Sequence, residues 1–113
     1  HPKLAEGQTE GATLNGISFA MTEEYIFSPT GKMLNPSFGH YKIFTTTDLP
    51  EMKTILVPTY EATGPYGAKS VSEISINGAL PAIANAIYDA AGVRVMSGPF
   101  TPEKILKLIK EKK

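Results

Sequence analysis

The stretch 77-NGALPAIANAIYDAAG-92 carries the clearest local pattern in this chain. Its apolar side chains recur at helical spacing and form one stripe, as in a helix that buries a single face. The stripe consists of Leu80, Ile83, Ala84, Ile87 and Ala91. Gly92 is suited to end the helix, because glycine readily adopts the left-handed conformation that follows many helix C-termini. The stretch therefore predicts an amphipathic helix packed on a core.

A second helix is expected at the chain start, over residues 3–24, where Leu14, Ile17 and Met21 recur at helical spacing. Three glycines, at positions 7, 11 and 16, interrupt this pattern. Each glycine costs a helix about 1 kcal/mol relative to alanine. Two explanations stay open: close approach of the backbone to another segment or a ligand, and plain helix-on-helix packing.

The last helix is expected to begin after Thr101, which is a good N-cap residue, with Pro102 at the first helical position. Its buried face should consist of Ile105, Leu106 and Ile109. Lysines gather toward the C-terminal end, where they complement the helix dipole. We interpret them as a solvated face.

Short extended segments are expected between the helices. Residues 25–27 and 32–35 flank a turn with Ser28, Pro29 and Gly31 at turn-favouring positions, which predicts a hairpin. Further strands are expected at residues 41–44, 53–57 and 93–96, and a long loop at 58–73. Together these elements predict an α+β fold, with helices packed on a small mixed β-sheet in two layers. Residues 1–113 should form a single domain.

Composition excludes several classes of function. The 113 residues include eleven basic and eleven acidic side chains, so no net positive charge favours nucleic acid. There is no cysteine, which excludes thiolate metal sites within this chain. There are only two histidines, so a metal bound by this chain would need carboxylate ligands. No apolar run approaches the ~20 residues of a membrane span, no stretch resembles a signal peptide, and a cytoplasmic location is expected. Because the chain opens HPKLAEG without methionine, we expect a piece of a larger protein.

The loop 64-GPYGAKSVSE-73 superficially resembles a phosphate-binding loop. That motif requires glycine directly before the lysine and again five residues earlier, where this chain has Ala68 and Thr63. Glu73 closes the loop before an apolar helix, and two interpretations are open. Apolar surroundings would disfavour its charged form and suit a general base. Alternatively it is a carboxylate stabilised by a helix N-terminus, which composition alone favours. His40 is expected to be a surface or hydrogen-bonded histidine.

Five segments, in order, resemble the molybdenum hydroxylases of the xanthine dehydrogenase and aldehyde oxidase family. These are EGQTEGATLNGISFAMTEE (6–24), LNPSFGHYKIFTTTDLP (34–50), GPYGAKSVSE (64–73), PAIANAIYDAAGVRV (81–95) and GPFTPEKIL (98–106). The first is similar to that family's G-Q-x-E-G helix, and the third to its loop G-P-x-G-A-K-G-V-G-E. The similarity covers essentially the whole chain.

The resemblance implies the C-terminal part of a molybdopterin-binding subunit. Glu73 would be the general base for hydroxylation of an electron-poor carbon in a purine, another N-heterocycle or an aldehyde. Gln8 would contact the pterin, and the preceding loop would lie against the cofactor; these loop residues are Ala68, Lys69, Ser70, Val71 and Ser72. No side chain here would bind the metal, because the pterin dithiolene does so.

The resemblance also implies cofactors and partners. Molybdopterin, as the cytosine dinucleotide or a related form, would bind in the full enzyme. Fe–S clusters and FAD would belong to other domains or subunits. The isolated fragment would carry no cofactor and be inactive. Partners would be the remainder of the molybdenum subunit and the Fe–S and FAD domains or subunits; a homo-oligomer is compatible, and neither nucleic acid nor a membrane is expected.

The chain also departs from the family pattern. Ser70 and Ser72 replace the two loop glycines, and Ile74 and Ser75 replace prolines that commonly follow the glutamate. These departures leave an alternative open: a non-catalytic cofactor-binding or subunit-interface module of the same fold. A free-standing binder of a small ligand is a third interpretation.

Overall fold

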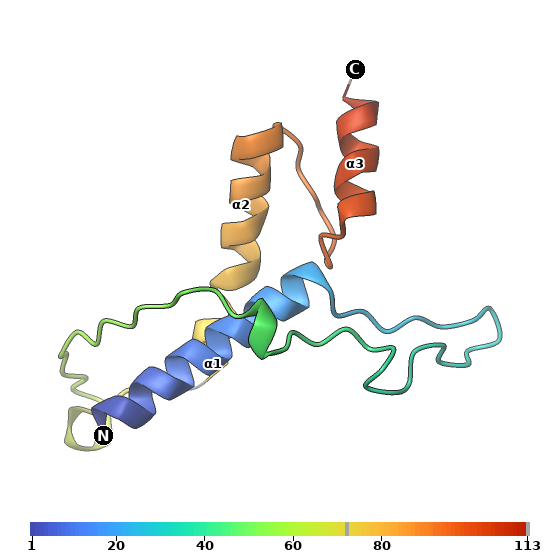
Figure 1. Ribbon diagram of the computed structural model, residues 1–113. Coiled ribbons are helices and arrows are strands. Elements are labelled where there is room, and N and C mark those ends of the chain that lie inside the picture. The colour runs from blue at the N-terminus through green and yellow to red at the C-terminus, as the bar shows by residue number, and fades with distance from the viewer. Residues whose placement is uncertain (72, 113) are drawn as a thin grey trace.

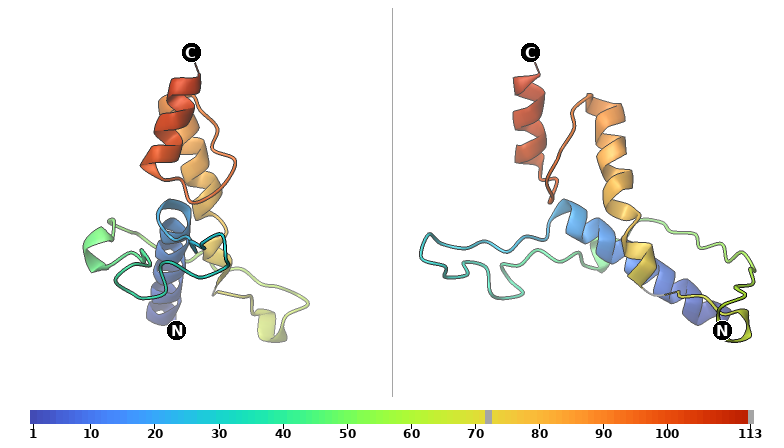
Figure 2. Two further views of the ribbon diagram at one scale, coloured as in Figure 1. Left: turned by 90° about the vertical axis from the view of Figure 1, so that its right-hand side faces the viewer. Right: turned by 180° about the vertical axis from the view of Figure 1, so that it is seen from behind.

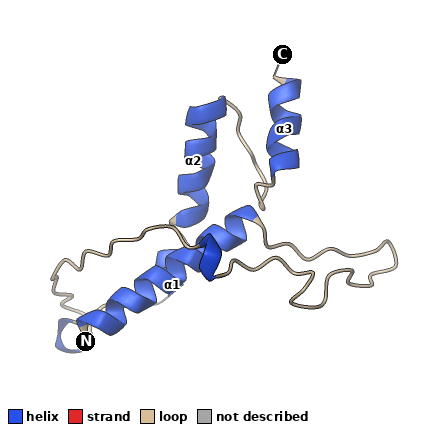
Figure 3. Ribbon diagram, viewed as in Figure 1, coloured by secondary structure: helices blue, strands red, loops and turns tan. Residues whose placement is uncertain are grey.

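The computed structural model describes residues 1–71 and 73–112. Within them, three α-helices are joined by long irregular segments that carry short 3₁₀ helices (Figures 1 and 3). The α-helices are α1 (Pro2–Met21), α2 (Ala79–Ala91) and α3 (Pro102–Glu111). The 3₁₀ helices are η1 (Thr46–Asp48), η2 (Pro65–Gly67) and η3 (Glu73–Ile76). Helices α2 and α3 rise from the C-terminal half of α1, with their linker between them (Figure 1).

The helix ends follow the expected capping chemistry. Gly92 ends α2 in the left-handed conformation, with φ 65°. The Thr101 side chain accepts a hydrogen bond from the Lys104 amide at 3.4 Å, and Pro102 opens α3. At the chain start, the Leu4 amide donates to Nδ1 of His1 at 3.3 Å. The three predicted helices are present, although α1 ends at Met21 and not at residue 24.

A small core lies where the three helices converge. It consists of Ala20, Val95 and Phe100, with partly buried side chains of α1, α2 and α3 around them. The Phe100 amide donates to the Ala20 carbonyl at 2.6 Å, which ties the linker to the end of α1. The predicted stripe of α2 contributes its central residues, Ile83, Ala84 and Ile87.

The predicted buried face of α3 is only partly correct. Ile105 packs on the core as expected, but Leu106 and Ile109 are exposed and Leu108 takes their place. The apolar residues 105, 106, 108 and 109 cover a wide arc of the helix. Contact with Val95 and Phe100 selects which part of that arc is buried, and the spacing of residues cannot specify it.

The predicted α+β fold, with helices on a mixed sheet, is wrong. The described residues are 48% helical and form essentially no strands. Phe27 and Met33 form an isolated antiparallel bridge. Segments 41–44, 53–57 and 93–96 form no strands. Their β-branched residues fit a pleated, half-buried surface, but a strand also needs a neighbour for its backbone hydrogen bonds.

The predicted turn at the tip of the first hairpin is present. The Gly31 amide donates to the Ser28 carbonyl at 2.9 Å, and Gly31 has φ 81°. At the other end, buried Asn35 joins the two sides of the hairpin. Its Oδ1 accepts from the Ile26 amide at 2.9 Å, and its Nδ2 donates to the Glu24 carbonyl at 2.7 Å.

Two long arms extend from the helical part in different directions (Figures 1 and 2). We call residues 22–45 the hairpin arm and residues 49–63 the second arm. The hairpin arm is anchored on α1, because Ser18 Oγ accepts from the Phe44 amide at 3.0 Å. At the base of the arm, Thr22 Oγ1 donates to the Lys42 carbonyl at 2.6 Å and joins its two ends. The radius of gyration is 17.6 Å, against about 13 Å for a compact domain of this length.

Candidate active-site loop

Helix α1 supports η3 by a close backbone approach at Gly16. A Cβ at this position would lie 2.6 Å from the Ile76 carbonyl oxygen and 2.8 Å from the Ala79 Cβ. Gly16 therefore explains one of the three glycines that interrupt the helix. Glu73 is the first residue of η3, and Ile76, which makes this contact, is the last.

Gly7 and Gly11 behave differently from Gly16. Within the described part of the chain, no heavy atom of another segment lies within 4 Å of a Cβ built at either position. They are one helical turn apart and thus lie on the same face of α1. The N-terminal half of α1 therefore presents open backbone, next to the exposed side chain of Gln8.

The start of the loop is a tight turn closed by its own backbone. The Gly67 amide donates to the Gly64 carbonyl at 3.1 Å, and the Ala68 amide donates to the Pro65 carbonyl at 3.0 Å. Gly67 has φ 78°, where only glycine is relaxed, and a Cβ there would overlap the Tyr60 ring. Tyr66 also has a positive φ, 55°.

Glu61 anchors the entry to this turn. Its Oε1 accepts from the Thr63 hydroxyl at 2.8 Å and from the Thr63 amide at 3.1 Å. These hydrogen bonds, the hydroxyl first, hold the pKa of the Glu61 carboxyl below its ordinary value because they favour its charged form. The Glu61 amide also donates to the Gly67 carbonyl at 3.1 Å. The turn is therefore shaped before any ligand arrives.

The predicted site residues fall on three parts of this arrangement. Gln8 is exposed on α1, eight residues before Gly16 and so about 12 Å from it along the helix axis. Residues 68–71 follow η2 and are exposed, while the η2 turn projects away from α1 (Figure 2). Glu73 is exposed at the start of η3. Ser72 lies outside the described residues. Helix α1 thus carries Gln8 and supports the element that begins with Glu73.

Known proteins share both sequence and shape with this chain. The family model of the molybdopterin cofactor-binding domain matches residues 1–50. The chain is 45% identical to the probable hypoxanthine oxidase XdhD of Escherichia coli, over 98% of this chain and 12% of that protein. It is 38% identical to the putative xanthine dehydrogenase molybdenum-binding subunit XdhA of Escherichia coli, over 93% of this chain and 14% of that protein. The chain belongs to the molybdenum-binding subunits of the xanthine dehydrogenase family.

Solved structures of other oxidoreductases share the open shape. Quinoline 2-oxidoreductase from Pseudomonas putida matches with a TM-score of 0.87 and 28% identity, over 97% of this chain and 14% of that chain. The reconstituted CO dehydrogenase from Oligotropha carboxidovorans matches with a TM-score of 0.84 and 26% identity, over 97% and 14%. The chain therefore spans only a small part of the length of the molybdenum-binding subunits that it matches.

The exposed polar groups on α1 and the loop suit a large polar ligand. Among residues 1–71 and 73–112, no three His, Cys, Asp or Glu side chains are grouped so that they could hold a metal ion. His40 lies on the hairpin arm, where its Nδ1 is hydrogen-bonded to Ser37 Oγ at 2.8 Å. An exposed amide on α1, open glycine backbone beside it and a preformed loop suit hydrogen bonding to a large polar group.

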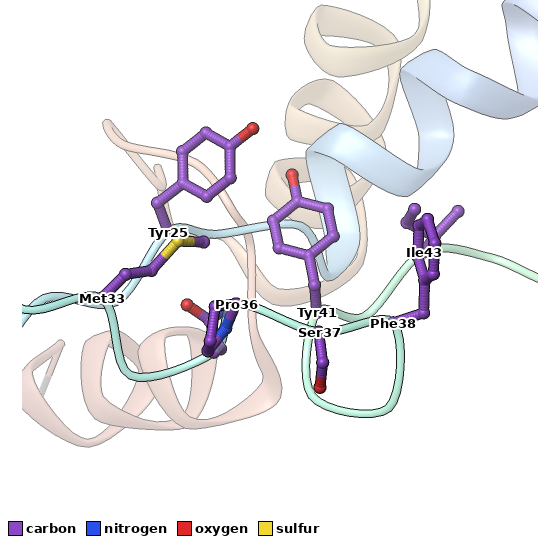
Figure 4. Close-up of a pocket in the computed structure, with 8 residues that line it drawn as sticks. Tyr25, Met33, Pro36, Ser37, Phe38, Tyr41 and Ile43 are labelled. Atoms are coloured by element: carbon purple, nitrogen blue, oxygen red, sulfur yellow. The ribbon is translucent and has the colours of Figure 1, made fainter.

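Sequence reasoning missed an apolar pocket on the hairpin arm (Figure 4). The Tyr25 and Tyr41 rings lie 5.2 Å apart, centroid to centroid, on one side of it. Its volume is about 390 Å³, and its lining is Tyr25, Met33, Asn35, Pro36, Ser37, Phe38, Tyr41 and Ile43. The signal available in the sequence was the density of aromatic and apolar residues across a segment too short for its own core.

No helix in the described part of the chain is long and apolar enough to cross a membrane.

Proposed function

We propose that this chain is part of a molybdenum hydroxylase in which Glu73 is the general base. The reaction would add a hydroxyl group to an electron-poor carbon of a purine, another N-heterocycle or an aldehyde. The observation that supports the proposal is the contact of η3, which begins with Glu73, with α1 at Gly16, together with the glycine-containing turn at the start of the loop. The relatives of this chain are molybdenum-binding subunits, which supplies the chemical context.

Each proposed site residue has a distinct task. The Gln8 amide would donate to and accept from polar groups of the pterin, and residues 68–71 would line the cofactor. When bound, the molybdenum cofactor supplies the two-electron oxidation chemistry. The Glu73 carboxylate would take the proton from the attacking hydroxyl and hold it on one carboxylate oxygen. A base of this kind must lie within about 2.6–3.2 Å of the proton donor.

The substrate and the electron acceptors belong to the rest of the proposed enzyme. The relatives are named for different substrates: hypoxanthine, xanthine and an aldehyde, with quinoline and carbon monoxide among the structural neighbours. We propose that Fe–S and FAD domains or subunits receive the electrons, in the cytoplasm. The 6-hydroxypseudooxynicotine dehydrogenase relative is named as a subunit of a complex, which supports a multi-part assembly.

The test is the variant Glu73→Gln in the complete molybdenum-binding subunit. Glutamine keeps the size of the side chain but cannot accept the proton, so turnover should fall by about 10²–10⁴-fold. Molybdenum and pterin content, measured by metal analysis and by cofactor release, should stay at the wild-type level. A matched control is Glu51→Gln, which neutralises another exposed carboxylate and should leave turnover unchanged.

The alternative is a non-catalytic cofactor-binding or subunit-interface module. The departures Ser70 and Ser72 favour it, because the family commonly has glycine at both positions. The same variant separates the two functions. Normal turnover together with normal cofactor content in Glu73→Gln would reject the general-base role and leave cofactor binding as the function.

A further inference from the structure

Both arms expose large apolar side chains. Phe38 on the hairpin arm is 92% exposed, and Ile55 and Val57 on the second arm are each 73% exposed. Other exposed apolar residues of the arms include Tyr25, Ile26, Phe27, Leu34, Ile43, Leu49 and Tyr60. Large exposed apolar patches are rare on soluble monomers and mark interaction sites, and so many exposed apolar side chains on two short segments point to the same role.

The hairpin arm is apolar on both of its faces. Successive side chains of an extended segment point to opposite faces, so Tyr25 and Phe27 share one face and Ile26 lies on the other. All three are exposed. A two-stranded ribbon is at best marginally stable in water, and this one has a single bridge, between Phe27 and Met33. To be stable, the hairpin arm therefore needs other polypeptide packed against each of its faces.

The structural neighbours indicate which polypeptide packs against the arms. The match to quinoline 2-oxidoreductase includes the arms, because it spans 97% of this chain at a TM-score of 0.87. It uses only 14% of that longer chain. The same open arms thus occur in a protein that has a great deal of additional polypeptide.

A second copy of this chain is a poorer candidate for the polypeptide that packs there. A two-fold contact uses one self-complementary patch on each copy. The apolar side chains here occupy both faces of the hairpin arm and also the second arm, which extends in a different direction (Figures 1 and 2). One two-fold contact would leave much of this surface in water.

We propose that the hairpin arm is an internal docking surface, covered on both faces by the remainder of the molybdenum-binding subunit. Phe38 inserts into apolar surface of that remainder. The pocket beside Tyr25 and Tyr41 in turn receives an apolar side chain from it (Figure 4). This interface is independent of the role of Glu73, because no step of the reaction enters the argument.

The first test is hydroxyl-radical footprinting of the complete subunit, read residue by residue by mass spectrometry. Phe100, which is 2% exposed, is an internal reference for a buried phenylalanine. In dilute, monomeric subunit we expect Phe38 to be oxidised as slowly as Phe100. Fast oxidation of Phe38 in the monomer overturns the proposal. Protection that develops only at concentrations where the subunit self-associates, or only after another subunit is added, also overturns it.

A second test uses substitution at the anchor. Phe38→Asp in the complete subunit should lower the thermal midpoint, because it brings a charge into an apolar contact. Phe38→Leu should retain most of the midpoint, since it keeps an apolar side chain. An unchanged midpoint in Phe38→Asp overturns the proposal. If Phe38→Asp fails to fold, the footprinting of the wild-type subunit still decides. Neither test involves turnover, so failure here is distinguishable from failure of Glu73 as the base.

Discussion

At the residue scale, the three glycines that interrupt α1 have different surroundings. Gly16 permits η3 to contact α1 through the Ile76 carbonyl and Ala79. Among the described residues, no atom of another segment lies within 4 Å of a Cβ built at Gly7 or Gly11, and we propose that their open backbone faces the cofactor. The sequence indicates that another segment or a ligand could approach the helix backbone at these glycines. It cannot show which of the three is contacted. Only the path of the chain after residue 72 separates their roles.

Gly16→Ala should destabilise the subunit by about 1–3 kcal/mol, as overpacking of a tight contact does. The reason is that the new Cβ would press on the backbone of η3 and on the start of α2. The measurement is the free energy of unfolding of the cofactor-free subunit in urea. A wild-type value would contradict the close approach at Gly16.

Gly11→Ala is the matched control on the same helix. It meets open space in this chain and replaces a poor helix former, so the cofactor-free subunit should gain up to about 1 kcal/mol. If Gly11 faces the cofactor, the same variant should also reduce the molybdopterin content of purified subunit. A normal content would argue against a cofactor at this face of α1.

At the element scale, the surroundings of Tyr41 on the hairpin arm change the pKa of its hydroxyl group. Burial, and then the carboxylate of Glu23, raise the pKa of Tyr41 to about 12, because both disfavour the phenolate. In the unfolded chain a tyrosine titrates near 10. The contribution of Tyr41 to stability is therefore complete below about pH 10 and is lost as the pH rises toward 12.

Replacement of the neighbouring carboxylate tests this arrangement. Glu23→Gln should lower the pKa of Tyr41 toward that of an ordinary tyrosine, measured by the NMR shift of the Tyr41 ring carbons during an alkaline titration. Glu24→Gln is the control, because Glu24 pairs instead with Lys104, at 3.6 Å. Equal effects of the two substitutions would show that Glu23 has no specific influence.

At the scale of the whole molecule, the small core contrasts with the extended arms. Few apolar side chains in the described part of the chain are buried: Ala20, Ala79, Val93, Val95 and Phe100. The radius of gyration of 17.6 Å reflects arms with little contact to the helices. Burial of apolar surface is the main favourable term in folding, and here much of that surface stays in water.

The 113-residue chain produced alone should therefore lack a cooperative thermal transition. Circular dichroism should show helix that melts gradually, and a dye for apolar surface should bind before heating. A sharp transition of a monomer without dye binding would contradict the requirement for additional polypeptide around the arms.

Local signals determined the three helices in this protein. The stripe of Ile83, Ala84 and Ile87, the capping residues Thr101 and Gly92, and the turn at Gly31 each act through neighbouring residues, so the sequence alone predicts them. The family could also be inferred from ordered motifs. The role of Glu73 as general base remains a prediction.

Tertiary structure decided the remainder. The β-branched segments were expected to form a sheet, but the described chain has little pairing for them, and strand formation depends on partners distant in sequence. Which side of α3 is buried, which glycine of α1 is in contact, and where the apolar pocket lies all depend on contacts between segments far apart in the chain. Residue spacing specifies a helix or a turn because its hydrogen bonds are local. It cannot specify those contacts, because they are set by the three-dimensional path of the whole chain.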